Sequence, residues 1–480
     1  MNNKNKEYDI IVIGAGPSGI ASAVSSASNG AKVLIIDLNS NLGGQVYKTP
    51  PETYKKIEKN SSKEIRMQKS FKKLIDENGI DVALKHTVWQ VNHGFKIYAF
   101  NNNNQNVFWE CKTLIIATGT YERIIPFPGW TLPGVIGLAA STTLLKSHRV
   151  LPGNNTVVAG CGPLLAVVAS GIIKAGGKVG AIIDLKSPFD WLSSIRPMLS
   201  NPSSLFEGIG WLKNIIFSGT PIYFNSVIKE VNKKENELEI SITKINPRNN
   251  RKYDNKIKLK ADSLCVGHGL IPSIDILKSL GAEIFFESES LTWLPKINKY
   301  FQSSIENLYI VGDGSGITGA IPAYEKGLIA GHAASLDLEY IDSEKFIIIT
   351  NKIFVKLKKF ENFGKSMAKL MTPSSFIINS ITKETIVCRC EDIKRAEIEE
   401  AIKIGAKEIN QLKSWTRCGM GPCQGRTCED SISRIISEHV GDRKSVGMFT
   451  RRFPIQPISM NSVVGQFKYE DIINVEEGPL

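Results

Sequence analysis

The sequence predicts an α/β fold made of two dinucleotide-binding units followed by a small helical domain rich in cysteine. Two observations support this prediction. A pattern of apolar strand, glycine turn, small-residue helix and second apolar strand begins at residue 9 and returns at residue 155, and such alternation is typical of parallel sheets covered by helices. In addition, five of the eight cysteines fall between Cys388 and Cys428, which indicates a metal site.

The length and composition are those of a multidomain globular protein. The 480 residues suggest two to four domains, with 42% apolar and 22% charged residues. The net charge of +12 comes from scattered lysines without interleaved aromatics, so we favour solvated faces, or a face for an acidic partner, over nucleic-acid binding. No apolar run reaches the roughly 18 residues of a transmembrane segment, and the early first strand leaves no room for a signal peptide. We therefore expect a cytoplasmic protein.

The first unit carries a glycine motif between a strand and a helix. Residues 9–13 form the strand, residues 20–28 the helix and residues 32–36 the second strand, which ends at Asp37. The motif has the spacing G-x-G-x-x-G and consists of Gly14, Ala15, Gly16, Pro17, Ser18 and Gly19. A position after a strand and before a helix is the context that a dinucleotide site requires.

Each glycine of the motif has a physical task in such a site. Gly14 permits the tight turn, Gly16 lets the backbone approach a pyrophosphate, and Gly19 lets the helix lie close to the sheet. The pyrophosphate then faces free N–H groups and the positive end of the helix dipole. Asp37 can hold the adenosine ribose hydroxyls. The unit is therefore predicted to bind a dinucleotide, with a vestigial fold as the alternative.

Two later motifs decide which dinucleotide is expected. They close the apolar strands at residues 114–119 and 309–313 and comprise Ala117, Thr118, Gly119, Gly312 and Asp313. Both resemble motifs of the two-dinucleotide-domain flavoprotein superfamily, which implies FAD. By this resemblance Asp313 binds the flavin ribityl chain, although it could instead cap the next helix. The helix from Gly319 would point its N-terminus at the flavin.

Three further residues complete the predicted flavin site. Gly44 and Gln45 follow the second strand, where this superfamily passes the chain over the flavin, and Gln45 could hydrogen-bond the ring. A plain turn is the alternative for this pair. Val88 is the last residue that we expect at the cofactor.

The second unit repeats the pattern with one departure. Gly160 and Gly162 take the first two glycine positions, but Leu165 stands at the third and pushes helix and strand apart or shifts the helix. Asp184 takes the acid position. The unit could bind NAD, ATP or another adenine nucleotide, or be a structural remnant. Thiol–disulfide chemistry is disfavoured, because Cys161 stands alone and no close cysteine pair follows the flavin motif.

The C-terminal cysteines have the pattern of an iron–sulfur site, since a [2Fe-2S] cluster needs four thiolates. Cys388 and Cys390 present two sulfurs from one turn, and Cys423 and Cys428 lie in a loop whose glycines let it wrap closely around a cluster. We choose these four as ligands and leave Cys418 as a spare thiol. Tetrahedral zinc is the rival metal, although zinc usually shows C-x-x-C spacing.

Taken in order, the motifs resemble one family over nearly the whole chain. Segment 117–141 reads A-T-G-T-Y-E-R-I-I-P-F-P-G-W-T-L-P-G-V-I-G-L-A-A-S. It resembles the alpha subunits of heteromeric amine and imino-acid dehydrogenases. These include opine oxidases, D-hydroxyproline dehydrogenase, dye-linked L-proline dehydrogenase and hydrogen cyanide synthase, with the sarcosine oxidase alpha subunit more distant. Segments 160–165, 312–320 and 388–428 continue the match, and the last resembles the bacterioferritin-associated-ferredoxin-like [2Fe-2S] domain.

The resemblance implies a division of labour. A separate flavoprotein beta subunit of the amine-oxidase type oxidises the C–N bond, and this chain relays the electrons through FAD and [2Fe-2S]. A small ferredoxin-like subunit could belong to the complex. The six histidines are scattered and no acid/base pair can be recognised, so no catalytic residue is assigned. A self-sufficient NAD(P)H-dependent FAD oxidoreductase is the alternative, and a non-catalytic iron–sulfur assembly protein is a third candidate.

The expected fold is thus a two-dinucleotide-binding-domain flavoprotein with an inserted NAD-like domain and a C-terminal [2Fe-2S] domain. Within the last, residues 392–404 and 409–415 predict amphipathic helices. The expected segments are a first FAD part at 1–150, the inserted domain at 151–262, a second FAD part at 263–345, a connection at 346–384, the [2Fe-2S] domain at 385–438 and a tail at 439–480.

Overall fold

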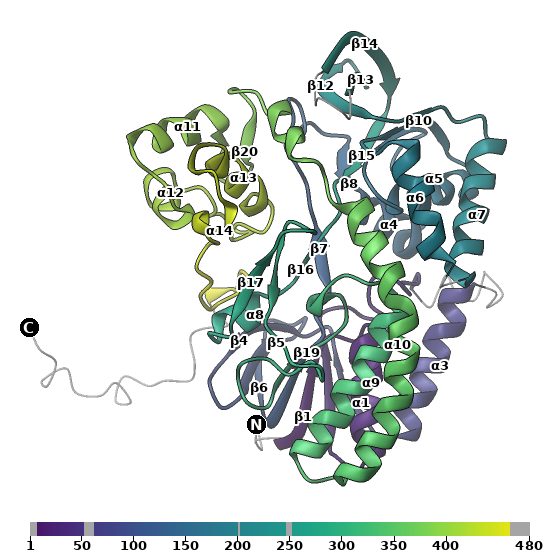
Figure 1. Cartoon of the computed structure of the whole chain (residues 1–480), viewed down its shortest axis with the longest axis vertical. Coiled ribbons are helices and arrows are strands. Elements are labelled where there is room, and N and C mark those ends of the chain that lie inside the picture. The colour runs from purple at the N-terminus through teal and green to yellow at the C-terminus, as the bar shows by residue number, and fades with distance from the viewer. Residues whose placement is uncertain (1–6, 52–61, 200–201, 246–251, 461–480) are drawn as a thin grey trace, which may run out of the picture.

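The computed structural model describes residues 7–51, 62–199, 202–245 and 252–460. These residues form two parallel sheets with covering helices, a long connecting helix and a separate small helical domain (Figure 1). The mixed α/β fold predicted from the sequence is confirmed. The segment limits stay predictions, and residues 461–480 of the expected tail lie outside the described part.

The first sheet holds the N-terminal unit. Its strand order is β3-β2-β1-β6-β5-β4, and β19 pairs with β6. The strands are β1 Glu7–Ile13, β2 Val33–Asp37, β3 Asp81–Leu84, β4 Thr87–Val91, β5 Lys96–Phe100, β6 Asn106–Ile116 and β19 Leu308–Ile310. Strands β3, β2, β1, β6 and β19 run parallel, whereas β4 and β5 are antiparallel additions. Ile10 and Val12 belong to one hydrophobic core and Ile11 and Ile13 to another, because both faces of the sheet are covered.

Helices cover one face of this sheet. They are α1 Pro17–Ser28, α3 Lys63–Glu77, α9 Ala320–Asp337 and α10 Ser343–Met371. Helices α1 and α9 approach closely, since a Cβ at Gly327 or Gly331 of α9 would overlap atoms of α1. Helix α10 lies beside α9 and continues upward along the molecule to the second sheet (Figure 1). One long helix therefore spans both units.

The second sheet has the order β11-β10-β9-β15-β8. Its strands are β8 Val135–Gly137, β9 Asn155–Gly160, β10 Lys178–Asp184, β11 Ile222–Tyr223 and β15 Ser263–Gly267. Its helices are α4 Leu138–Thr143 with the π-helical turn η1 Leu144–His148, α5 Leu164–Lys174, α6 Pro188–Met198 and α7 Pro202–Phe217. An antiparallel sheet joins it, formed by β12 Ser226–Lys234, β13 Glu237–Ile245 and β14 Lys252–Ala261. The strand–turn–helix–strand pattern predicted twice is confirmed in both sheets.

Short elements link the sheets. They are β7 Thr120–Glu122, β16 Leu270–Pro272, β17 Ile284–Glu287, β18 Thr292–Pro295, α8 Asp275–Ser279 and the 3-10 helices η2 Gly312–Ser315 and η3 Ser375–Ser380. Strand β7 pairs with β16, so the chain that leaves the first sheet is held beside the chain that returns from the second.

The cysteine-rich domain is compact and lies to one side of both sheets (Figure 1). Its elements are β20 Ile386–Cys388, β21 Ile393–Lys394, α11 Arg395–Ile404, α12 Ile409–Thr416, α13 Glu429–Val440 and α14 Arg443–Val446. The two predicted helices are confirmed as α11 and α12, with β21 occupying the expected start of the first. Apolar residues of these helices form a core of their own around Cys388, Cys418 and Cys428.

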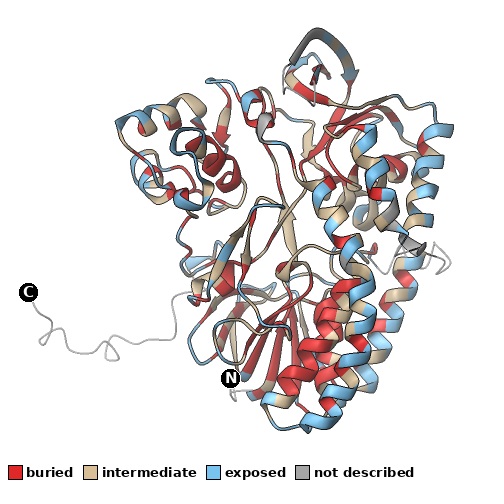
Figure 2. Cartoon of the chain, viewed as in Figure 1, coloured by how far each residue is buried: buried red, intermediate tan, exposed pale blue. Residues whose placement is uncertain are grey.

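Two surface properties bear on function. None of the helices in the described residues is both long enough and apolar enough to cross a membrane. Helices α6 and α7 nevertheless present apolar side chains to solvent, and Figure 2 shows much of the outer face of α7 exposed. The exposed apolar residues of the two helices include Phe189, Leu192, Ile195, Phe206, Ile209, Leu212, Ile216 and Phe217.

Candidate functional site

The first glycine turn is tightly packed on two of its sides. Gly14 has φ +114°, and a Cβ there would collide with the carbonyl of Ala117. A Cβ at Gly19 would overlap the carbonyl oxygen of Gly14, so helix α1 can approach the sheet only with glycine at this position. Ser18 lies against Gly312 in the same way. These contacts place the motifs of strands β1, β6 and β19 together at the carboxyl end of the sheet, where such folds bind ligands.

Gly16 faces open space. It is the N-cap of α1 with φ −75° and ψ 177°, and Pro17 follows it. Within the part of the chain that the structure describes, no atom apart from its chain neighbours lies within 4 Å of where its Cβ would be. The loop at Gly44 passes close to this turn, because a Cβ on Gly44 would lie 2.9 Å from the Cα of Gly16. The backbone N–H of Gly43 donates to the carbonyl of Ala15 at 2.8 Å, which fixes the approach. The turn therefore offers a helix N-terminus with room for an anion.

Asp37 ends β2 and holds the turn together. Its buried carboxylate accepts the backbone N–H of Ala15 at 2.6 Å. The other oxygen accepts the backbone N–H and the side-chain amide of Asn39 at 2.7 and 2.8 Å. Asp37 thus lies where the sequence predicts it, beside the glycine motif, and has a structural task there besides any contact with a ribose.

The Ala117–Gly119 turn and the Gly312–Asp313 turn lie next to the glycine motif. Thr118 donates its hydroxyl to the carbonyl of Ser273 at 2.9 Å. One carboxylate oxygen of Asp313 accepts the backbone N–H groups of Thr318 and Gly319 at 2.9 and 3.1 Å, and Gly319 is the N-cap of α9. Asp313 thus orders the loop before α9, but Gly319 is the N-cap of that helix and no side chain caps it, so the alternative of Asp313 as the helix cap is wrong.

Lys326 of α9 was not expected from the sequence. Its side chain is buried and donates to the carbonyl of Gly316 at 2.8 Å. Burial lowers its pKa to about 8, although Asp313 nearby acts in the opposite direction. It braces the loop between Gly312 and the helix. The only signal in the sequence is a lysine among the small and apolar residues of a helix that covers the sheet.

Gln45 and Val88, the two remaining predicted cofactor contacts, differ in their exposure to solvent. Gln45 is exposed beside Gly44 on the loop that crosses the glycine turn. Val88 lies in β4 and its side chain is buried in the hydrophobic core of the first sheet. Their contacts with a cofactor stay predictions.

The second glycine turn is covered by the chain itself. Met371, the last residue of α10, lies against it, and its Cγ is 2.7 Å from where a Cβ on Gly162 would be. The thiol of Cys161 donates to the carbonyl of Met371 at 3.6 Å. The carboxylate of Asp184 accepts the indole N–H of Trp191 at 2.7 Å. Burial raises the pKa of Asp184 to about 6.

The cysteine-rich domain brings all five C-terminal cysteines together. The sulfur atoms of Cys388, Cys418 and Cys428 lie within 4.8 Å of one another, and all three residues are buried. Cys390 is exposed and Cys423 is half-buried, and their thiols hydrogen-bond to each other. The sequence predicts four of these five as ligands, and which four bind stays a prediction. Cys418, the one left out, is among the three closest sulfurs.

The loops around the sulfurs are closely packed and rich in N–H donors. The thiols of Cys418 and Cys428 donate to Cys388 and lower its pKa well below the ordinary value of a cysteine, although burial acts against this. The N–H of Gly419 also donates to the Cys388 sulfur, at 3.5 Å. The ring of Phe449 covers the loop, since a Cβ at Gly419 would lie 2.6 Å from it. Thiolates stabilised by N–H donors are the ligands that iron–sulfur clusters use.

Buried ion pairs fix this domain against the flavin motifs. Asp430 of α13 pairs with Arg123 at 3.4 Å and with Arg434 and Arg443 at 2.8 Å. Burial raises the pKa of Asp430, but the three guanidinium groups outweigh it and hold that pKa well below its usual range. The indole N–H of Trp130 donates to the carbonyl of Ile386 at 2.7 Å.

A second set of buried ion pairs centres on Asp275, the first residue of α8. Its carboxylate pairs with Arg426 at 2.7 Å and with Arg451 at 2.8 Å. Arg451 also pairs with Glu429, the residue that follows Cys428. Because α8 packs in the core of the first sheet and Arg426 lies between the last two cysteines, this cluster positions the cysteine loop against that sheet. No motif in the sequence singles out Asp275.

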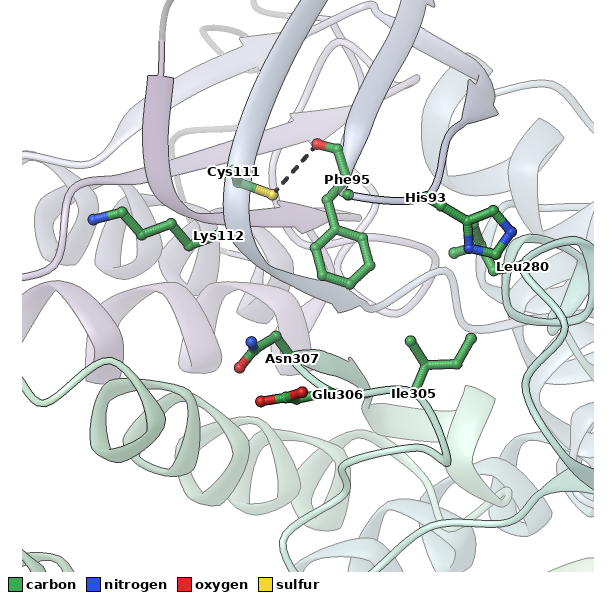
Figure 3. Close-up of a pocket in the computed structure, with 9 residues that line it drawn as sticks. His93, Phe95, Cys111, Lys112, Leu280, Ile305, Glu306 and Asn307 are labelled. Atoms are coloured by element: carbon green, nitrogen blue, oxygen red, sulfur yellow. Dashed lines mark hydrogen bonds between the residues drawn. The ribbon is translucent and has the colours of Figure 1, made fainter.

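A cavity of about 340 Å³ lies away from all these motifs. It is lined by His93, Phe95, Cys111, Lys112, Leu280, Ile305, Glu306 and Asn307 (Figure 3). Cys111 pairs in register with Tyr8, near the start of β1, whereas the glycine turn follows the end of that strand. Parallel sheets bind ligands at the carboxyl ends of their strands. The cavity therefore does not belong to the predicted flavin site.

The fold and the three turns define a class of protein, the FAD-dependent oxidoreductases with two nucleotide-binding folds. A family model described as pyridine nucleotide-disulphide oxidoreductase matches residues 8–327, and one described as sarcosine oxidase A3 domain matches residues 382–466.

Comparison with known proteins narrows the class. The chain is 30% identical to an opine oxidase subunit of Agrobacterium tumefaciens, covering 94% of this chain and 90% of that protein. It is 28% identical to hydrogen cyanide synthase subunit HcnB of Pseudomonas aeruginosa, covering 94% and 97%. The solved structure of L-proline dehydrogenase from P. horikoshii has the same fold, with a TM-score of 0.68 at 18% identity, covering 96% of this chain and 80% of that one. The chain therefore belongs to the pyridine nucleotide-disulphide oxidoreductase family and, within it, to the group that contains this opine oxidase subunit. The resemblance inferred from the motifs is confirmed.

Proposed function

We propose that this chain is the FAD- and [2Fe-2S]-containing electron-transfer subunit of a heteromeric amine or imino-acid dehydrogenase. A separate flavoprotein subunit of the amine-oxidase type would oxidise the C–N bond, and a small ferredoxin-like subunit could complete the complex. Relatives named as subunits of opine oxidase and of hydrogen cyanide synthase support a role as one of several subunits.

The observation that carries the proposal is a single segment that touches both candidate sites. Thr118 and Gly119 form part of the turn beside the glycine motif. A few residues later, Arg123 pairs with Asp430 and Trp130 donates to the first strand of the cysteine-rich domain. A chain that only bound a flavin, or only bound a metal, would not need its flavin turn and its cysteine loops held by one rigid connection.

The residues at the first turn fit FAD. The backbone around Gly16 faces open space at a helix N-terminus and can hold a pyrophosphate. The hydroxyl oxygen of Thr318, next to the Asp313 turn, is buried and has no hydrogen-bond partner among the described residues, so it can bind a polar cofactor group. Lys326 and Asp313 keep that loop in place.

The five clustered cysteines likewise fit a [2Fe-2S] cluster, which needs four thiolates. Bound to this chain, FAD and the cluster would together accept electrons in pairs and pass them on singly. The chain's own part is to hold the two groups at a fixed separation, shield them and align their protein ligands. Zinc is the rival for the thiolates and is separated from iron by metal analysis.

A self-sufficient NAD(P)H oxidoreductase finds less support. Such an enzyme needs the second glycine turn free for the pyrophosphate of the nicotinamide nucleotide. Met371 lies against that turn at Gly162, and the indole N–H of Trp191 donates a hydrogen bond to the carboxylate of Asp184. The second unit is therefore better suited to a structural task than to NAD or ATP.

The apolar outer face of α6 and α7 agrees with membership of a complex. Phe206, Ile216 and Phe217 alone are 72%, 71% and 78% exposed. Exposed apolar side chains gathered on two neighbouring helices suit a contact with a partner. A cytoplasmic location stays a prediction.

The test is an oxygen-free purification of the full chain followed by cofactor analysis. We expect bound FAD, about two iron atoms and about two acid-labile sulfides per chain, little zinc, and almost no amine dehydrogenase activity without partner subunits. Titration with NADH should leave the flavin oxidised. A colourless chain without sulfide, or a flavin that NADH bleaches within seconds, would contradict the proposal.

A further inference from the structure

The five C-terminal cysteines fall into an inner and an outer group. The inner group is Cys388, Cys418 and Cys428, whose sulfurs lie within 4.8 Å of one another and which are at most 1% exposed. The outer group is Cys390, which is exposed, and Cys423, which is half-buried. A [2Fe-2S] cluster takes four thiolates, so one sulfur in this set has no ligand position in the resting protein.

The position of Cys418 sets it apart from an ordinary core cysteine. Its thiol hydrogen-bonds to Cys388 and Cys428, so within the core of the domain it points toward the two other inner cysteines. Its sulfur lies within 4.8 Å of the sulfurs of both residues. By contrast Cys111, buried in the first sheet, has a backbone carbonyl as its neighbour.

Cys418 and Cys423 belong to the same loop, which contains Gly419 at φ +85° and Gly421 between them. Gly421 lies against Cys390, where any Cβ would collide with the side chain of that cysteine. Glycines at these positions permit a rearrangement that exchanges one sulfur of the loop for the other. Cys388 and Cys390 come from a different segment and need not move.

The outer ligands are also the vulnerable ones. An exposed thiolate is the site at which peroxides act, whereas a buried sulfur is protected. Cys423 is half-buried while Cys418 is 0% exposed. The chain therefore holds a protected sulfur within reach of a cluster whose outer ligand is accessible.

We propose that Cys418 is a reserve ligand that replaces Cys423 on the cluster when Cys423 is lost. This inference depends on the iron–sulfur part of the proposed function. In the exchange the iron–sulfur bond to Cys423 would break and the Cys423 sulfur would leave as a thiolate that takes a proton from solvent. The Cys418 thiol would give its proton to solvent, and its thiolate would bond the same iron. No electron is transferred, so the charge and oxidation state of the cluster are unchanged.

The test compares four variants of the full chain, purified without oxygen: Cys418→Ala, Cys423→Ala, the double variant Cys418→Ala/Cys423→Ala, and Cys111→Ala as a control for loss of a buried thiol elsewhere. Iron and acid-labile sulfide per chain are measured, together with visible circular dichroism and the EPR spectrum after reduction. Flavin content and thermal unfolding report whether each variant folds.

The reserve role predicts a specific order of results. Cys418→Ala and Cys111→Ala should match the wild type in iron, sulfide and spectra. Cys423→Ala should keep at least half of the wild-type iron and sulfide with an altered spectrum, because a different sulfur now bonds the iron. The double variant should contain at least tenfold less iron and acid-labile sulfide per chain than the wild type. Flavin content should be equal in all four.

Two results would overturn the inference and leave the proposed function intact. One is a wild type with its cluster but a Cys423→Ala variant as empty as the double variant. The other is loss of the cluster in Cys418→Ala alone, which would make Cys418 a resident ligand. A wild type without iron or sulfide would instead remove the iron–sulfur part of the proposed function, and the reserve ligand with it.

Discussion

The two glycine turns of this chain have nearly the same sequence pattern and opposite surroundings. At the first turn, no atom of the described residues, other than its neighbours in the chain, lies within 4 Å of where a Cβ on Gly16 would be. At the second, Met371 fills the corresponding place at Gly162, with its Cγ 2.7 Å from the Cβ position. The strand order around both turns is that of a nucleotide-binding fold. The glycines therefore specify the shape of the turn, and a distant part of the chain decides whether a ligand can reach it.

The acids that end the second strands differ in the same way. Asp37 is bonded by neighbours of its own turn, Ala15 and Asn39, so it reinforces a site that stays open. Asp184 is bonded by the indole of Trp191, a bulky group from the next helix. The first unit leaves the face around its glycine turn open. The second unit uses the equivalent face to hold α6 and α10.

The largest effect is expected from Gly16→Val. The backbone at Gly16 is extended, with φ −75° and ψ 177°, so valine is tolerated and the free energy of unfolding should change by less than about 0.5 kcal/mol. Its branched side chain would occupy the place of the pyrophosphate. Flavin affinity should fall at least a thousandfold, about 4 kcal/mol, measured by titrating the apoprotein with FAD.

The contrasting variant is Gly162→Val. Its φ of +92° and its contact with Met371 make valine strained at this position, so the second unit should lose stability while flavin affinity stays at the wild-type value. Normal flavin binding by Gly16→Val would show that the first turn is not the pyrophosphate site.

The next effect concerns the ion pairs that attach the cysteine-rich domain to the first unit. Asp430→Asn leaves Arg123, Arg434 and Arg443 without their shared carboxylate in a buried setting. Breaking a buried pair of this kind costs about 3 kcal/mol or more, seen as a lower urea midpoint. Glu400→Gln, which breaks an exposed pair with Lys403 at 3.9 Å in the same domain, should cost less than about 0.5 kcal/mol. Equal effects would mean that the Asp430 cluster does not hold the domains together.

A smaller effect is expected from Met371→Ala, which removes the Cγ nearest to Gly162 and so opens the second turn in part. Truncating this half-buried side chain should lower the free energy of unfolding by about 1–2 kcal/mol. It should also raise the affinity for ADP by about tenfold, or 1.4 kcal/mol, measured by calorimetry. Met367→Ala, one turn earlier on α10, is the control for a lost methionine. If the wild type binds ADP as well as the variant does, Met371 does not close the site.

The sequence is informative wherever local geometry decides the outcome. Gly14 and Gly19 must be glycine because backbone atoms lie where a Cβ would be, and the motif expresses that requirement directly. The strands and helices around both turns follow from the alternation of apolar runs and small residues. The cysteine spacing likewise predicts that five sulfurs belong to one small domain, and three of them lie within 4.8 Å of one another.

The sequence does not predict contacts between residues that are far apart along the chain. Met371 lies 210 residues after Cys161, its hydrogen-bond partner, and no pattern announces this contact. Nothing in the sequence distinguishes Asp275 and Asp430 from other acidic residues, because their arginine partners are brought to them only by the fold. The spacing of the cysteines along the chain leaves Cys418 as a spare thiol, and it gives no sign that the fold places its sulfur among the innermost three.

The smallest expected effect tests a residue between the two units. Glu122 ends β7, just after the first unit's Gly119 turn, and its carboxylate accepts the N–H of Ala139 at 3.0 Å and contacts Gly267 of the second sheet. Burial raises its pKa to about 7, whereas an unfolded glutamate titrates near 4.3. Between these values the folded chain binds more protons than the unfolded chain, so the free energy of unfolding falls as pH rises from about 4.3 to about 7.

Glu122→Gln removes this proton linkage and keeps an oxygen that can accept the N–H of Ala139. The variant should therefore be more stable than the wild type by about 1 kcal/mol at pH 8 and equal to it near pH 4.5, measured by urea unfolding at both pH values. Glu110→Gln, whose carboxylate is paired with Lys96 at the surface, is the control and should show no such gain at pH 8. A variant less stable than the wild type at pH 8 would mean that the ionised carboxylate of Glu122 binds the two units together, and that their junction depends on charge and not on packing.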